Sequence, residues 1–285
     1  MIKKQQVILV SSEALVFAAL FFLGNTIPPK NKKPALASDS PHAGTPAITT
    51  DQIIKQSKQS LKPEQVTRLT SLENAVVRGD TKNQQLSVDH QLARFWGDTM
   101  NNRVLGAYYL GESAKLENSE KNLTFAARLL LDELMQSDNP PMQQWLGTET
   151  KKLFEKSLEL NPNNDSARIG IGACYMFGNI SDNPMQGILT IRQIAEKNPD
   201  NLYAQMMLGM GGVRSGQYDK AIERFLIVVN KQPGNLEAIF HLAETYDRKG
   251  DKVNAIKWYK NAEEKIAVPE AKKEIEARIK TLQTN

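Results

Sequence analysis

Similar residues recur 34 positions apart in the last third of the chain. Five pairs share this spacing: Leu208 and Leu242, Gly216 and Gly250, Ala221 and Ala255, Phe225 and Tyr259, and Val228 and Ala262. A fixed period of this length is typical of proteins in which one supersecondary unit stacks on the next. Because each unit contacts mainly its neighbours, the repeat predicts an elongated stack of units.

The residue types within one unit predict two helices. From residue 51 onward the apolar residues recur at helical spacing, and no alternating strand pattern occurs. Gly216 is placed to end the first helix, where a left-handed backbone is needed. Ala221 is small where two helices would cross closely, and Phe225 follows to fill the crossing. Pro233 ends the second helix.

Two earlier units follow the same order with less regular spacing. Gly187 precedes Pro199 by 12 residues, as Ala221 precedes Pro233, and three extra residues fall in the loop Asn179–Pro184. A further unit ends in the string LFEKSLELNP and is expected to begin with a helix over Leu123–Met135. The chain is therefore predicted to contain four units.

The strings GQYDKAIERFLIVVNKQPG and GDKVNAIKWYKNAEE resemble the second half of the tetratricopeptide repeat motif. The resemblance is good over 165–266, fair over 123–164 and faint over 87–122. It implies an all-α fold, an α-α superhelix in which the first helix of each unit lines a concave side.

The chain departs from that motif at two kinds of position. Gly212 stands where the first helix usually has a tyrosine, whereas Tyr175 and Tyr246 match the motif. No tryptophan occupies the early site of the first helix.

The N-terminal segment has two interpretations. Val7–Gly24 is the one strongly apolar run, and its uninterrupted part, Ala14–Gly24, has the length of a signal-peptide core. The whole run is just long enough to span a bilayer. The single suitable cleavage triplet, at 35–37, lies too far downstream, so we favour an uncleaved transmembrane anchor. No cysteine before Cys174 could carry a lipid, which excludes lipoprotein processing.

The charge of the chain is concentrated at this end. Residues 1–34 hold five lysines and one glutamate, whereas the remaining residues hold 31 basic and 31 acidic side chains. A neutral main part argues against nucleic-acid binding, which needs concentrated Lys and Arg. The short N-terminal tail is easily retained inside, so we expect a single-pass protein of a bacterial inner membrane with most of the chain in the periplasm.

These patterns predict the following organisation of the chain. The expected segments are an anchor or signal sequence (1–24), a disordered proline-rich linker (25–50), a helical extension with a degenerate repeat (51–122), tetratricopeptide-like repeats (123–266) and a capping helix (267–285). The anchor, the linker and the NPMQGI string together resemble membrane-anchored repeat proteins of Bacteroidetes-type bacteria.

No pattern in the chain indicates catalysis. One cysteine and three separated histidines leave little material for a metal or nucleophilic site, and no phosphate loop or nucleophile elbow occurs. Asp132 and Glu133 are expected to form a solvated face, and Cys174 a half-buried structural thiol. We therefore predict no catalytic, cofactor-binding or metal-binding residue, no small-molecule substrate and no enzymatic activity; an active site in 51–120 has no residue to support it.

The first helices of the units carry a candidate binding groove. Its predicted residues, from the equivalent faces of three units, are Ile169, Ala173, Met176, Tyr203, Met206, Met210, Val213, Phe240, Glu244 and Asp247. The wall they form would be methionine-rich at its centre and acidic at its end, which suits an irregular apolar or amphipathic segment of another protein. The alternative is that the stripe is buried packing.

The expected function is therefore a non-catalytic, membrane-tethered adaptor or scaffold that binds another protein through its concave groove. One alternative is an envelope biogenesis or chaperone accessory that holds client chains. Another, of a different class, is a structural solenoid that assembles with copies of itself. The sequence names neither the partner nor the oligomeric state.

Overall fold

The computed structural model describes residues 48–78, 81–181 and 183–284. Every regular element in these ranges is a helix and none is a strand, which confirms the predicted all-α class. The apolar run 7–24 and nearly all of the linker 25–50 lie outside the described residues. Within the described ranges, no helix combines the length and the apolar character that crossing a bilayer requires.

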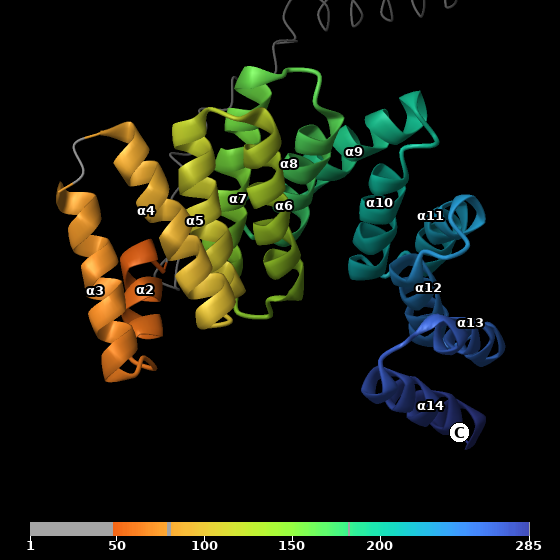
Figure 1. Ribbon diagram of the computed structural model, residues 1–285. Helices are drawn as coiled ribbons and strands as arrows, with labels where there is room; N and C mark the ends of the chain where they lie inside the picture. Colours follow the sequence, from red (N-terminus) through yellow and green to blue (C-terminus); the bar gives the residue numbers. More distant parts are fainter. Residues whose placement is uncertain (1–47, 79–80, 182, 285) are drawn as a thin grey trace, which may run out of the picture. The chain divides into compact units, whose positions relative to one another are not determined.

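The helices follow one another along the unit Pro46–Asn285 (Figure 1). They are α2 Thr50–Lys58, α3 Pro63–Arg78, α4 Lys82–Arg94, the π-helical turn η1 Phe95–Thr99, α5 Arg103–Glu117, α6 Glu120–Gln136, α7 Pro140–Leu160, α8 Asp165–Phe177, α9 Met185–Lys197, α10 Leu202–Arg214, α11 Tyr218–Lys231, α12 Leu236–Lys249, α13 Lys252–Lys265 and α14 Pro269–Thr284. The most extensive packing joins α6 to α7, α8 to α9, α10 to α11 and α12 to α13. These are the helix pairs of the predicted units.

The same capping residue begins the first helix of three successive units. Asn164, Asn201 and Asn235 each accept a hydrogen bond through Oδ1 from the backbone N–H three residues later, at 3.0–3.1 Å. Such a cap stabilises a helix by about 1 kcal/mol because it satisfies an otherwise unpaired N–H. Two first helices end at glycines in the left-handed region, Gly216 (φ 71°) and Gly250 (φ 85°), as the sequence predicted.

The predicted helix crossings form the centre of each repeat. Ala221 and Phe225 of α11 are fully buried, and so is Ala255 of α13. A Cβ atom added to Gly209 of α10 would overlap the Phe225 ring. Gly209 of α10 therefore lets the Phe225 ring of α11 fill the crossing. A larger residue at Gly209 or at Ala221 would separate the two helices.

The N-terminal helices use another device for close packing. The π-helical turn η1 brings Gly97 against Gly106 of α5, where an added Cβ would lie 2.9 Å from the Gly97 Cα. Trp96, in the same turn, is almost completely buried. Trp145 of α7 donates through Nε1 to Thr50 Oγ1 at 3.1 Å, so the first described helix is fastened to the repeat stack.

The C-terminal helix α14 covers the end of the stack. Ile275, Ile279 and Leu282, the stripe read from the sequence, are buried on the side that packs against α13. The charged residues of α14 remain outside, as a terminal helix needs in order to keep an apolar end from solvent.

Candidate functional site

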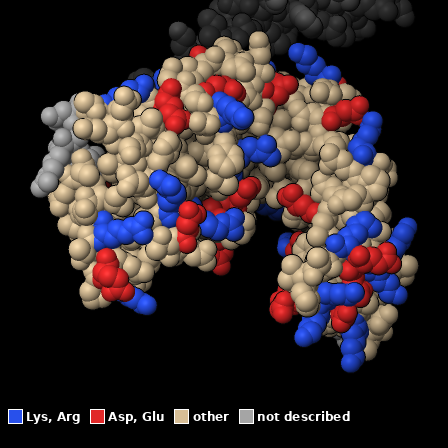
Figure 2. Space-filling view, in the orientation of Figure 1, with Lys and Arg blue, Asp and Glu red and all other residues tan. Residues whose placement is uncertain are grey.

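The first helices of successive units contact one another and form one continuous surface. Helix α8 packs on α6, α10 packs on α8, and α12 packs on α10. We call the surface formed by α6, α8, α10 and α12 the first-helix face. In the view of Figure 2, Lys and Arg side chains alternate with Asp and Glu over the molecule and do not gather into one basic patch.

The ten residues of the predicted groove differ in their access to solvent. Ile169, Ala173, Met176 and Met206 are buried; Tyr203, Met210, Val213, Glu244 and Asp247 are partly exposed; Phe240 is exposed. The α8 part of the stripe is thus packing within the stack. The part that a partner can reach lies on α10 and α12.

Small residues explain why the α8 stripe is buried. Met176 packs against Gly211 of α10 so closely that a Cβ atom at Gly211 would overlap its Cε. Gly170 faces the Phe154 ring of α7 in the same way. Because Gly170 of α8 and Gly211 of α10 have no side chain, α7 and α10 pack closely against α8 and bury this part of the stripe.

Helix α6 also contributes to the first-helix face, which the sequence did not reveal. The Arg128 guanidinium lies 4.8 Å from the centre of the Tyr203 ring, within the range of a cation–π contact. Tyr203 Oη is buried and has no hydrogen-bond partner among the described residues. Asp132 lies one turn after Arg128; desolvation raises the pKa of its carboxyl, and Arg128 opposes that shift. Arg128 and Asp132 are four residues apart and so lie on one face of the helix. This spacing was the sequence signal that could have pointed to α6 as part of the surface.

Helix α12 presents an aromatic ring between acids. The Phe240 ring is 41% exposed, and its inner side meets Tyr259 edge-on at 6.0 Å between centroids. Glu244 lies one turn later and pairs with Arg248 at 2.7 Å. His241 stacks on the Phe225 ring, and burial lowers the pKa of its imidazole, which favours the neutral form. An apolar group flanked by carboxylates is therefore accessible here.

Asp247, the last residue of the predicted acidic end, has an internal partner. Its two carboxylate oxygens accept from Arg278 Nε and Nη2 of α14 at 2.6 and 2.7 Å, and Tyr259 Oη donates to it at 3.2 Å. The Arg278 hydrogen bond holds the pKa of this carboxyl below its ordinary value. Asp247 thus attaches the cap helix.

The residues that could suggest chemistry are not assembled into a reactive site. Burial raises the pKa of the Cys174 thiol far above its usual range, so the thiol is unreactive. Glu133 faces Arg103 at 2.8 Å, away from Asp132. In the part of the chain that the structure describes, no three His, Cys, Asp or Glu side chains lie close enough to hold a metal ion.

Solved structures with the same helical-repeat arrangement exist, whereas no model of a known protein family matches the chain. TTC0263, a thermophilic tetratricopeptide repeat protein of Thermus thermophilus, is 14% identical; the match covers 72% of this chain and 100% of that one, with a TM-score of 0.51. MamA from Desulfovibrio magneticus RS-1 (residue 41 to its end) is 20% identical over 66% and 96% of the two chains, with a TM-score of 0.41. YrrB, a tetratricopeptide repeat protein, is 16% identical over 67% and 90%, with a TM-score of 0.37. At these identities the likeness to TTC0263 concerns the fold, and the fold of this chain is that of tetratricopeptide repeat proteins.

Proposed function

We propose that this protein is a non-catalytic, membrane-tethered adaptor that binds a segment of another protein on the first-helix face. The observation that carries the proposal is the exposed Phe240 ring on α12; Met210 and Val213 of the neighbouring helix α10 are partly exposed as well. An exposed aromatic ring is a good anchor for a partner, because binding removes its large apolar surface from water.

The charges around Phe240 define the chemistry of the partner. Glu237 and Glu244 lie on α12 on either side of Phe240, and Glu237 is exposed. A partner segment would cover the ring with an apolar side chain and place Lys or Arg near these carboxylates. An amphipathic helix with a basic edge has this arrangement, and helix-in-groove binding is its usual mode.

The membrane part of the proposal rests on the sequence. The apolar run 7–24 would anchor the chain in a bacterial inner membrane, with the repeats in the periplasm. Protease added to intact spheroplasts should then degrade the repeats. Repeats that become accessible only after lysis would reverse the proposed orientation.

Partner capture tests the binding part. The full chain, solubilised from membranes, is used as bait, and its co-purifying proteins are quantified by mass spectrometry for the wild type and for Phe240→Arg. The substitution places a cation where an apolar and basic segment would bind, so at least one protein should be lost. Val253→Arg is the matched control, because Val253 is an 81% exposed apolar residue on the second helix α13.

Three results would contradict this assignment of the surface. A capture profile that Phe240→Arg leaves unchanged would remove the first-helix face as the binding site. Loss of self-association alone, measured by light scattering of the solubilised chain, would favour the self-assembling solenoid. If Phe240→Arg captured many unfolded proteins less well, all to the same degree, the result would favour an accessory that holds client chains.

A further inference from the structure

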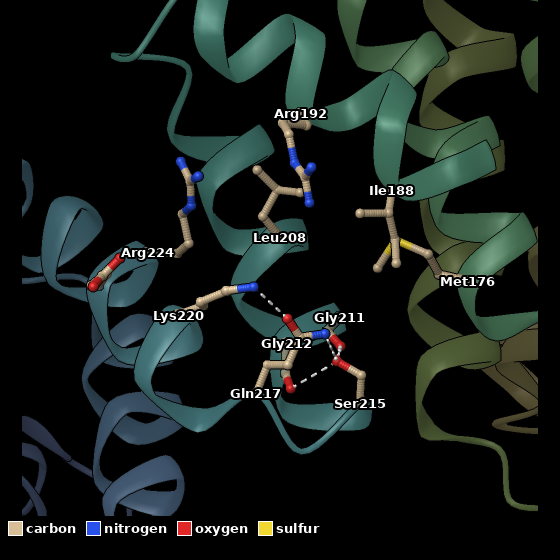
Figure 3. A pocket seen from close by; sticks show the side chains of 11 residues that line it. Met176, Ile188, Arg192, Leu208, Gly211, Gly212, Ser215, Gln217, Lys220 and Arg224 are labelled. Atoms are coloured by element: carbon tan, nitrogen blue, oxygen red, sulfur yellow. Dashed lines mark hydrogen bonds between the residues drawn. The ribbon is translucent and has the colours of Figure 1, made fainter. Parts of the chain in front are cut away.

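A cleft of about 320 Å³ opens between α9, α10 and α11 (Figure 3). One wall is apolar and consists of Met176, Ile188 and Leu208. The other lining residues include three cations, Arg192 of α9 and Lys220 and Arg224 of α11. The volume is at the lower end of the range for sites that enclose a small ligand or a single side chain.

The cleft exists at a position where the repeat motif has an aromatic side chain. Gly212 lies in its wall, and the equivalent residues of the units before and after it are Tyr175 and Tyr246. In the unit before, Lys151 Nζ of α7 lies 6.0 Å from the centre of the Tyr175 ring. Ile188, which lines the cleft, is 37 residues after Lys151, and Gly212 is 37 residues after Tyr175. The space that the Tyr175 ring fills in one unit is therefore open in the next.

Helix packing does not require this glycine. A Cβ atom at Gly212 would lie 3.1 Å from Ala221 Cβ and 3.3 Å from the Ala221 Cα and N, so the two helices would have to move apart by a few tenths of an ångström. The following unit has Tyr246 with Ala255 at the two equivalent positions, so tyrosine and alanine are compatible at this crossing. The open volume is thus a property of this unit and not of the repeat.

The three cations of the cleft have no acidic partners among the residues that the structure describes. Among the described residues, no carboxylate oxygen lies within 4 Å of a charged nitrogen of Arg192, Lys220 or Arg224, although Glu223 also lines the cleft. Arg224 Nη1 donates to Gln205 Oε1 at 2.9 Å, and Lys220 Nζ to Gln217 Oε1 at 2.8 Å. Figure 3 shows Arg192 extending from α9, and Lys220 and Arg224 from α11. Each guanidinium has five N–H donors, so most remain available to a ligand.

We propose that this cleft binds an aromatic ring that carries, or directly precedes, a carboxylate. The ring would occupy the space of the missing tyrosine against Met176, Ile188 and Leu208, and Arg192 and Arg224 would donate hydrogen bonds to the carboxylate. The lining of the cleft includes none of Met210, Val213 and Phe240, on which the binding proposed for the first-helix face rests, so the two sites can be tested separately.

Equilibrium dialysis of the full chain in nonionic detergent tests the site. The probes are 4-hydroxyphenylacetate, as a free aryl acid, and the blocked peptide acetyl-Ala-Tyr-Asp-Ala-amide, as a peptide segment. The neutral 4-hydroxyphenylacetamide and inorganic phosphate serve as controls for the carboxylate and for the ring. At least one of the two acids should bind with a Kd of about 1 mM or lower, given the ligand's size. Which acid binds identifies the source of the ligand.

Variants then show whether binding occurs in this cleft. Arg192→Gln and Arg224→Gln should each weaken binding about tenfold or more, since each removes charge-assisted hydrogen bonds. Gly212→Tyr should abolish binding by filling the cleft. Arg214→Gln, an exposed arginine of α10 that does not line the cleft, should change nothing. If Gly212→Tyr unfolds the chain, as circular dichroism would show, the two arginine variants decide.

Several outcomes would overturn the proposal. They are absence of binding by both acids, equal binding of the neutral amide, phosphate binding as tight as that of the acids, and binding that survives both arginine substitutions.

Discussion

Met206 on α10 and Phe240 on α12 occupy equivalent positions 34 residues apart, yet Met206 is 6% exposed and Phe240 is 41% exposed. Helix α10 has first-helix neighbours on both sides, α8 and α12. Its beginning is also covered by Arg128 from α6. Helix α12, by contrast, has a first-helix neighbour only in α10 among the described helices. It is joined to the cap helix α14 by the ion pair between Asp247 and Arg278. A repeat therefore fixes the direction of a side chain, whereas the neighbouring helices decide whether solvent reaches it.

The largest expected effect is on the buried member of the pair. Met206→Glu should lower the free energy of unfolding by at least about 3 kcal/mol, because a carboxylate would be buried without a partner. Phe240→Glu should lower it by less than about 1 kcal/mol, since the new carboxylate stays in water. Urea denaturation of both variants measures the difference. Similar losses for the two would show that the helices are not packed as described.

The cap helix gives the second expected effect. Asp247→Asn should destabilise the protein by about 1 kcal/mol at neutral pH, because it removes a two-bonded ion pair with Arg278 that is partly exposed. The pKa of Asp247 is lowered in the folded state, so its stabilisation is present above the unfolded value of about 3.9 and is lost as the pH falls through the folded value.

The pH dependence distinguishes this ion pair from simple packing. The difference in unfolding free energy between the wild type and Asp247→Asn should shrink as the pH falls below about 4. Arg278→Gln should lose stability with the same pH dependence, and Lys280→Gln, on the same helix but with no ion pair within the described residues, is the control. A difference that stays constant down to about pH 3 would assign the effect to lost packing.

The sequence predicted those features that depend on residues close together in one unit. The glycines that end first helices and the alanine–aromatic crossings are local and periodic, so Gly216, Ala221 and Phe225 could be placed correctly. The burial of Met206 depends on how three first helices approach one another. The pairing of Asp247 with Arg278 depends on where the last helix docks. Neither has a periodic signal.

The cleft beside α10 falls between these two cases. The missing tyrosine at Gly212 was visible as a departure from the repeat motif. What the sequence could not show is that Arg192 and Arg224, on two different second helices, both line the cleft. A departure from a repeat is thus a useful signal of a site, but its chemistry comes from residues that the period does not bring together.

The smallest expected effect concerns the exposed ring itself. Phe240→Ala should lower the free energy of unfolding by about 0.5–1 kcal/mol, because the substitution removes only the edge-to-face contact between the Phe240 ring and Tyr259. Val253→Ala, at an 81% exposed position, should change stability by less than about 0.5 kcal/mol. A loss of about 2 kcal/mol or more in Phe240→Ala would place Phe240 in the core and make its equivalence with Met206 complete. A small loss instead preserves the contrast between α10 and α12: the same repeat position is packing in one unit, and in the next it is free to contact a partner.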